Sequence, residues 1–258
     1  KVKEKIDIPL ALAMRYGSMS IEKGIKELID KGVTEIFLIP LYPHYAMSSY
    51  ETVVSKAEEI LAQKHPNIKL DVLPPFYNNS GYIKAMSNNI KNHLKGFHYD
   101  HILFSYHGIP ERHILKSDVT KSHCKIDGSC CERNSVSHHT CYRHQCFETT
   151  KEIAKSLNLK NGTYSNSFQS RLLKDPWLKP YTDFELEKFP SEGKKKLAVI
   201  TPAFVSDCLE TLEEIAIEGK EEFLKFGGTD YKHIPCMNDN EDWVDVMVYW
   251  IKNWQKSN

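Results

Sequence analysis

Residues 35–65, EIFLIPLYPHYAMSSYETVVSKAEEILAQKH, decide the fold class. A short apolar run, EIFLIPLY, is followed by a Pro-containing loop and then by a helical pattern. The same order recurs at residues 197–218, where LAVITP precedes a helical pattern that begins near Asp207. Strands that alternate with helices are typical of βαβ units, so the sequence predicts an α/β fold with parallel sheets.

The other segments extend this alternation along the chain. HILFSY at residues 101–106 is apolar on both faces, as expected of a strand that helices cover on each side. We expect strands at residues 8–14, 35–42, 69–73, 101–106, 163–168 and 196–202, and helices at 21–32, 50–65, 82–94, 142–157, from 207 and from 241. The two strand–loop–helix units indicate that two halves of the chain share one plan, with a boundary near Gly96. The expected division is residues 1–96, residues 97–240 with a cysteine-rich insert at 116–146, and a C-terminal helix at 241–258.

The composition excludes several classes of protein. Apolar residues make up 41% of the 258 residues and charged residues 26%, which is ordinary for a globular protein. Lys plus Arg and Asp plus Glu both number 34, so we expect no nucleic-acid partner. No apolar run approaches the ~20 residues that span a bilayer, and no signal peptide opens the chain, so we expect a cytoplasmic protein. Because the chain starts at Lys1 rather than Met, we also expect residues to be missing upstream.

The loops after two predicted strands carry candidate catalytic residues. In open α/β sheets, ligands bind outside the carboxyl ends of the strands. HILFSY leads directly into His107, where Gly and Pro stop the strand and leave the imidazole at its tip. A loop or core histidine with a structural role is the alternative. Residues 201–207 lead into a helix, with Ser206 or Asp207 as the expected N-cap.

Three acidic residues follow that N-cap at a regular spacing. Glu210, Glu214 and Glu218 recur every four residues, so at ~100° per residue they would share one face of an α-helix. Like charges at this spacing repel by ~0.2–0.5 kcal/mol per pair. The row is therefore either a solvated helix face or a surface that meets cations.

Several stretches match motifs of one enzyme family. FSYHGIPERH at residues 104–113 resembles a catalytic-histidine motif, and AFVSDCLETLEEI at 203–215 resembles a glutamate-bearing helix. The similarity extends to MRYG at 14–17, LIPLYPHYA at 38–46, FQSRLL at 168–173 and PWLKP at 176–180. These matches cover nearly the whole chain, and together they resemble the ferrochelatases.

The resemblance implies a reaction and a set of site residues. Two Rossmann-like halves would hold a porphyrin between them, the first half being incomplete because part of it lies upstream of Lys1. The implied reaction is insertion of Fe2+, as substrate, into protoporphyrin IX to make protoheme. His107 would ligate the metal or accept a pyrrole proton, Glu210 would be its carboxylate partner, and Asp207 is the second choice. We expect Glu214 and Glu218 to extend an acidic path along the helix for protons or cations, and the resemblance assigns Arg15, Tyr16, Tyr42 and Trp177 to porphyrin binding.

Other tetrapyrrole proteins are the alternatives. A coproporphyrin substrate stays open, because residues that contact the side-chain carboxylates are expected upstream. A cobalt chelatase usually places two histidines with a glutamate around the metal, whereas residues 201–210 contain no His, which favours iron. A non-catalytic tetrapyrrole or metal carrier would bind without turnover. The oligomeric state and any peripheral membrane contact stay open.

The insert contains five of the seven cysteines. Their spacing is Cys124, five residues, Cys130-Cys131, nine residues, Cys141, four residues, Cys146. No pair has the C-x2-4-C spacing of common structural zinc sites. Some ferrochelatases hold a [2Fe-2S] cluster in an internal segment like this one. Four thiolates suffice for such a cluster, and we nominate Cys124, Cys130, Cys131 and Cys141, with Cys146 as the weakest of the five candidates. A zinc site that uses His138, His139 or His144, or free thiols in a loop, are the alternatives.

Overall fold

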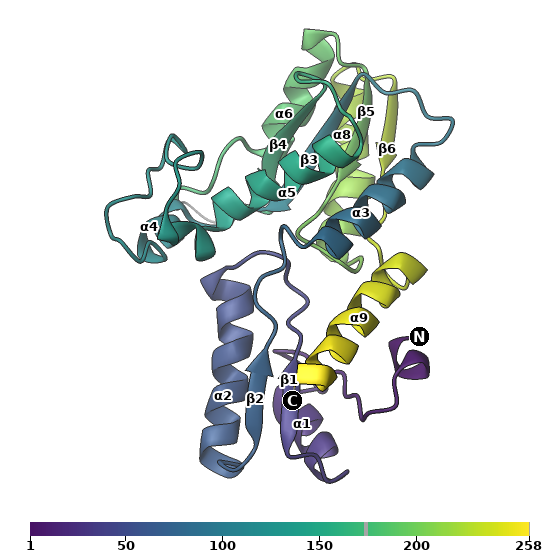
Figure 1. Ribbon diagram of the computed structural model, residues 1–258. Helices are drawn as coiled ribbons and strands as arrows, with labels where there is room; N and C mark the ends of the chain where they lie inside the picture. The colour runs from purple at the N-terminus through teal and green to yellow at the C-terminus, as the bar shows by residue number, and fades with distance from the viewer. Residues whose placement is uncertain (173–174, 258) are drawn as a thin grey trace.

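Two separate parallel sheets organise the molecule, as Figure 1 shows. The computed structural model describes residues 1–172 and 175–257. Within them, the smaller sheet pairs β1 (Glu35–Leu38) with β2 (Lys69–Val72), and the larger sheet has the order β4-β3-β5-β6. Its strands are β3 (His101–His107), β4 (Tyr164–Gln169), β5 (Lys196–Ile200) and β6 (Asp230–His233). All four pairings are parallel, which confirms the predicted α/β class.

Helices follow most strands along the chain. They are α1 (Ile21–Ile29), α2 (Thr52–Lys64), α3 (Ser80–His93), α4 (Glu111–Lys116), α5 (Tyr142–Ser156), α6 (Thr182–Lys188), α7 (Leu209–Leu212), α8 (Gly219–Lys225) and α9 (Glu241–Ser257). Two π-helical segments, η2 (Met47–Glu51) and η5 (Glu214–Glu218), precede α2 and α8. In the part of the chain that the structure describes, no helix is both long and apolar enough to cross a membrane.

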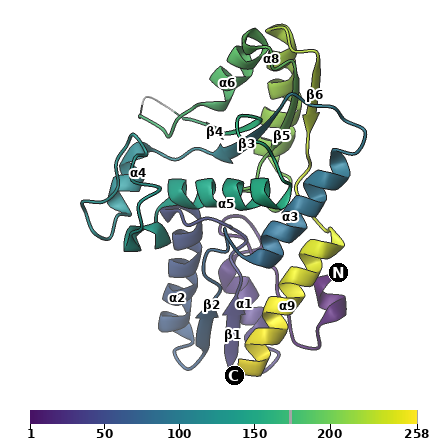
Figure 2. The same cartoon turned by 45° about the horizontal axis from the view of Figure 1, so that its top comes forward.

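The larger sheet is buried on both faces. Along β3, Phe104 and Tyr106 face a core shared with α3 and α5, whereas Leu103 faces a core shared with α6 and α8. Figure 2 shows the sheet between these two helical layers. This arrangement confirms that HILFSY is covered on each side, and it fixes the strand whose end carries His107.

The smaller sheet is covered by helices from both ends of the chain. α1 and α2 pack on one side through residues that include Ile36 and Ile60. On the other side, Val248 of α9 packs against Ile6, and the Trp254 ring stacks on Phe37 with ring centroids 5.3 Å apart. Figure 2 shows α9 beside β1 and the N-terminus. The helix α3 packs on α5, which covers the larger sheet, and also on α9, which covers the smaller sheet. Helices α3 and α9 therefore connect the larger sheet to the smaller one.

Three local predictions are wrong. Residues 8–14 do not form a strand, because in the described chain their only ladder contact is a single bridge between Met14 and Ser20. The segment after Asp207 is not one α-helix but the succession α7, η5 and α8. The N-cap of α7 is Cys208, because the Asp207 carboxylate accepts hydrogen bonds from the Cys236 N–H and from Asn238 instead.

Candidate active site

His107 stands at the carboxyl end of β3 and is half-buried. Its Nδ1 lies 2.6 Å from the carbonyl oxygen of Gly108. A carbonyl can only accept, so Nδ1 carries the proton in this hydrogen bond, and in the neutral imidazole Nε2 is the nitrogen with the lone pair. The Tyr142 hydroxyl donates to the carbonyl of His107 at 2.8 Å, which holds the strand end against α5. The imidazole is thereby oriented with Nε2 available as a ligand or proton acceptor.

Gly108 lets the chain turn directly after His107. A Cβ at this position would lie 2.8 Å from the carbonyl oxygen of Gln169 and 3.1 Å from Cε3 of Trp177. The Gly108 N–H also donates to that Gln169 oxygen at 2.8 Å. Trp177 is half-buried beside this turn, and its backbone bridges to Pro110. Two predicted residues, His107 and Trp177, are therefore brought to one turn.

Glu210 lies in the first turn of α7. The Cys208 thiol and Thr211 form a reciprocal cap at the start of this helix. A hydrogen bond from the Cys208 thiol lowers the pKa of the Glu210 carboxyl, its own N–H adds to this, and His107 contributes further when its imidazole is protonated. The structure thus brings His107 and Glu210 within electrostatic reach of each other, with the carboxylate ionised.

Gln169 connects these two residues and Ser170 contacts Glu214, although sequence reasoning selected neither Gln169 nor Ser170. The Gln169 amide donates to the carbonyl of Glu210 at 2.8 Å and accepts from the Ser105 hydroxyl at 2.8 Å. The Ser170 N–H donates to the Glu214 carboxylate at 2.6 Å, and its hydroxyl donates to the other oxygen. Gln169 is the last residue of β4, beside His107 of β3, and Ser170 follows it. The stretch FQSRLL was the one sequence signal for them.

The acidic row does not lie on one regular helix face. In η5, the Glu218 N–H donates to the carbonyl of Glu213, five residues back, so the turn is wider than an α-helical turn. The Tyr231 hydroxyl donates to the Ile215 carbonyl at 2.7 Å within this wider turn. Glu214 is half-buried against Ser170, whereas Glu218 is exposed.

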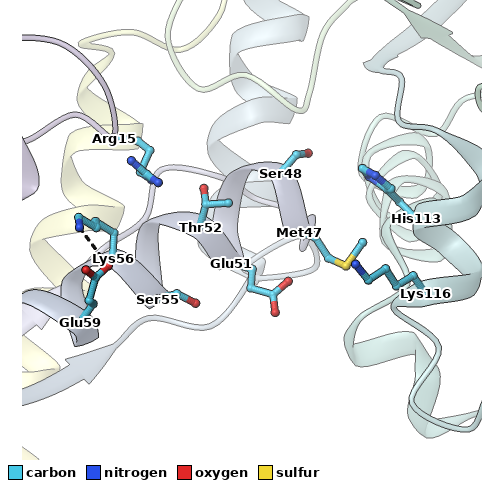
Figure 3. Close-up of a pocket in the computed structure, with 10 residues that line it drawn as sticks. All are labelled: Arg15, Met47, Ser48, Glu51, Thr52, Ser55, Lys56, Glu59, His113 and Lys116. Carbon is cyan, nitrogen blue, oxygen red and sulfur yellow. Dashed lines mark hydrogen bonds and ion pairs between the residues drawn. The ribbon is translucent and has the colours of Figure 1, made fainter. Parts of the chain in front are cut away.

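The other predicted porphyrin residues lie on the smaller sheet's side. The Arg15 guanidinium lies over the Tyr16 ring, 4.7 Å from its centroid, and Tyr16 is exposed. Burial raises the pKa of Tyr42, and Tyr16 contributes, so the two phenols face the same region. Arg15 also lines a pocket of about 550 Å³ between α2 and α4, shown in Figure 3. Its other lining residues are Met47, Ser48, Glu51, Thr52, Ser55, Lys56, Glu59, His113 and Lys116, so His107 and Glu210 lie outside it.

The predicted cluster ligands come together in the segment before α5, which we call the cysteine segment (residues 117–141). Cys124, Cys130, Cys131 and Cys141 are all buried and unpaired. The Cys141 thiol forms hydrogen bonds with Cys124 and Cys131. The Lys125 N–H donates to the Cys130 sulfur at 3.1 Å. Within residues 1–172 and 175–257, no group of three or more His, Cys, Asp or Glu side chains is arranged to hold a metal ion.

Asp118 organises the other end of this segment. It is buried, and it accepts hydrogen bonds from the N–H groups of Thr120, His123 and Cys124 and from the hydroxyls of Thr120 and Ser137. Burial acts to raise the pKa of this carboxyl, but these hydrogen bonds outweigh it and hold the pKa well below its usual range. Asp118 is therefore a buried anion that fixes the backbone of Cys124.

The chain is similar to known ferrochelatases over most of its length. The ferrochelatase family model matches residues 1–254. A ferrochelatase of Opitutus terrae is 46% identical over 248 residues, which are 96% of this chain and 72% of that protein. A ferrochelatase of Stutzerimonas stutzeri is 44% identical over 93% of this chain and 70% of its own length.

A solved structure shares the fold at low identity. SirB from Bacillus subtilis with Fe3+ has a TM-score of 0.58 and 14% identity, and the match covers 97% of this chain and 84% of SirB. At this identity the likeness concerns the fold alone. The family match and the identity to its curated members show that the chain belongs to the ferrochelatase family.

Proposed function

We propose that this protein inserts Fe2+ into protoporphyrin IX, with His107 and Glu210 facing the metal and the macrocycle. The family assignment supports the reaction. The observation that carries the residue assignment is an imidazole held through Nδ1 at the end of β3, with the Glu210 carboxylate within its electrostatic reach. The cytoplasmic location stays a prediction.

The reaction replaces two pyrrole N–H protons by Fe2+, so the site must accept two protons and desolvate one cation. Nε2 of His107 suits the first proton, because neutral imidazole is basic near neutral pH and also binds borderline cations. Glu210 supplies negative charge for the metal or takes the second proton. The half-buried Glu214 and the exposed Glu218 then offer a route for protons or cations between the site and solvent.

The porphyrin would lie along the face that carries Arg15, Tyr16, Tyr42 and Trp177. Trp177 offers an aromatic surface beside the His107 turn. The pocket in Figure 3 places Arg15 on one side and the cationic Lys116 and the titratable His113 of α4 on the other. These groups suit the carboxylates that a porphyrin carries at its rim. The substrate carboxylates would therefore point away from His107.

The cysteine segment would hold a [2Fe-2S] cluster on Cys124, Cys130, Cys131 and Cys141. The segment supports such a group because it contains four buried thiols, Cys141 forms hydrogen bonds with Cys124 and Cys131, and the Lys125 N–H donates to the Cys130 sulfur. Each iron of such a cluster takes two thiolates, so a site for one metal ion with three or more ligands is not required. The cluster would supply one-electron redox chemistry, and no step of metal insertion is assigned to it.

Steady-state kinetics with matched variants test the chelatase site. We expect His107→Ala and Glu210→Gln in the full-length protein to lower kcat for Fe2+ insertion by about 10²-fold or more. The controls are His98→Ala and Glu213→Gln, which change exposed residues and should keep normal rates. Ordinary turnover by the His107→Ala protein would overturn the assignment. Porphyrin binding without turnover by the unaltered protein would indicate a carrier instead.

A further inference from the structure

Arg143 is a buried guanidinium that touches the cysteine segment. It follows Cys141 in the first turn of α5, and only 3% of it is exposed. Its Nε lies 3.4 Å from the sulfur of Cys131, and a terminal nitrogen lies 3.8 Å from the sulfur of Cys130. The terminal nitrogens also donate to the carbonyls of Lys125 and Ile126. Every polar contact of this side chain is therefore with the cysteine segment.

The surrounding loop is shaped around this cation. Gly128 has a φ of +81°, and a Cβ there would lie 3.6 Å from Cζ of Arg143. The loop between Lys125 and Cys131 thus wraps the guanidinium closely. Five N–H donors in a planar fork allow one arginine to hold carbonyls and sulfur atoms at the same time.

Arg143 has no carboxylate within ion-pair distance among the described residues. Two other arginines do have one: Arg112 pairs with Asp175 at 3.1 Å and Arg171 with Asp183 at 2.7 Å. The charge of Arg143 makes only a small contribution to the lowered pKa of the exposed Asp127, which is due mainly to the Ser129 N–H. A buried cation without an anionic partner is strongly destabilising.

The sulfur atoms are the groups that can supply the missing negative charge. A neutral thiol carries no charge, but a thiol that binds a metal is deprotonated outright. An oxidised [2Fe-2S] centre with four thiolates has a net charge of −2, and accepting one electron makes it −3. A buried cation beside it stabilises both states and stabilises the reduced state more.

We propose that Arg143 is the counter-charge of the cluster site, which stabilises the bound cluster and raises its reduction potential. This role rests on the cluster proposed above. It requires the positive charge of residue 143, whereas a purely structural role would require only its hydrogen bonds to Lys125 and Ile126.

Two variants separate charge from hydrogen bonding. Arg143→Gln keeps an amide donor but removes the charge, and Arg143→Lys keeps the charge but removes the planar fork. Arg133→Gln removes an exposed arginine of the same segment and is the matched control. Each full-length protein is purified without oxygen. Iron and sulfide content, the visible spectrum and the midpoint potential in a dithionite titration are then measured.

We expect Arg143→Gln to bind several-fold less cluster and to shift the midpoint potential to more negative values. Arg143→Lys should retain a potential near that of the unaltered protein, and Arg133→Gln should change neither quantity. Equal potential and occupancy in the Arg143→Gln protein would overturn the counter-charge role alone. If Arg143→Lys lost as much cluster and shifted the midpoint potential as far as Arg143→Gln, the counter-charge role would also be overturned, because the charge would then not be the cause. An unaltered protein without iron–sulfur bands would overturn the cluster itself.

Discussion

The two candidate sites are held in place by different forces. The strand-tip site (His107, Gly108, Gln169, Ser170 and Glu210) stands on the ends of β3 and β4, and β3 is hydrogen-bonded to a strand on each side. The cysteine segment contains one short 3-10 turn, Val136–His139, as regular structure. Two buried charges, Asp118 and Arg143, fix its loops instead. The first site is therefore built into the sheet, whereas the second depends on a few polar contacts.

Replacing Asp118 should have the largest effect, and that effect should be confined to the cysteine segment. Asp118→Ala leaves three N–H groups and two hydroxyls without their acceptor, which should cost about 3 kcal/mol or more. Amide hydrogen exchange should accelerate throughout residues 117–141 while β3 and β5 stay protected. Asp127→Ala, at an exposed position of the same segment, is the control. Unchanged exchange in residues 117–141 would show that the carboxylate does not hold the segment.

The core beneath the strand-tip site should instead respond to acid. His44 is buried against Tyr106 and Tyr142, and burial lowers its pKa from 6.5 to about 3. Between these pH values the unfolded chain binds a proton at His44 that the folded chain does not, so stability falls as pH falls. The slope from this residue approaches about 1.4 kcal/mol per pH unit below pH 6.5, which amounts to about 2 kcal/mol from pH 6.5 to 4.5.

Denaturant unfolding at several pH values measures this effect. A His44→Gln protein should lose stability less steeply below pH 6.5 than the unaltered protein does. His98→Ala, at an exposed position, should leave the slope as it is. If the His44→Gln and unaltered proteins have parallel pH profiles, His44 is not the buried neutral group described here.

A methyl group at Gly108 should disturb the strand-tip site itself. In Gly108→Ala the new Cβ would meet backbone rather than a flexible side chain, so β3 or β4 must shift at a cost of about 1–3 kcal/mol. The thermal midpoint and kcat should fall together, because the shift moves His107. Equal kcat in the Gly108→Ala and unaltered proteins would contradict the tight turn.

The two regions also differ in how far the sequence predicts them. Periodicity indicates β3, and the rule for open sheets then places His107 at its tip. The sequence does not predict the hydrogen bond from Gln169 to Glu210, because the two residues are 41 positions apart and the acceptor is a backbone carbonyl. The same reason explains the wrong N-cap, since Asp207 is used by the distant Asn238. The cysteine pattern indicates thiol chemistry, but Asp118 and Arg143 look like ordinary loop and helix charges until their burial is known.

Removing the Gln169 amide should have the smallest effect and should separate positioning from stability. Gln169→Leu leaves the Glu210 carbonyl and the Ser105 hydroxyl without this partner, which should cost about 1 kcal/mol and lower kcat by less than about tenfold. The KM for porphyrin should hardly change, because Gln169 is buried behind Glu210 and does not line the pocket around Arg15. Gln169→Glu keeps the shape and the acceptor for Ser105 but loses the donor to Glu210, so its kcat should fall as in the Leu variant. A rise in KM with unchanged kcat would mean that Gln169 contacts the substrate and is not a positioning residue. The strand-tip site would then extend deeper into the sheet than its hydrogen bonds indicate.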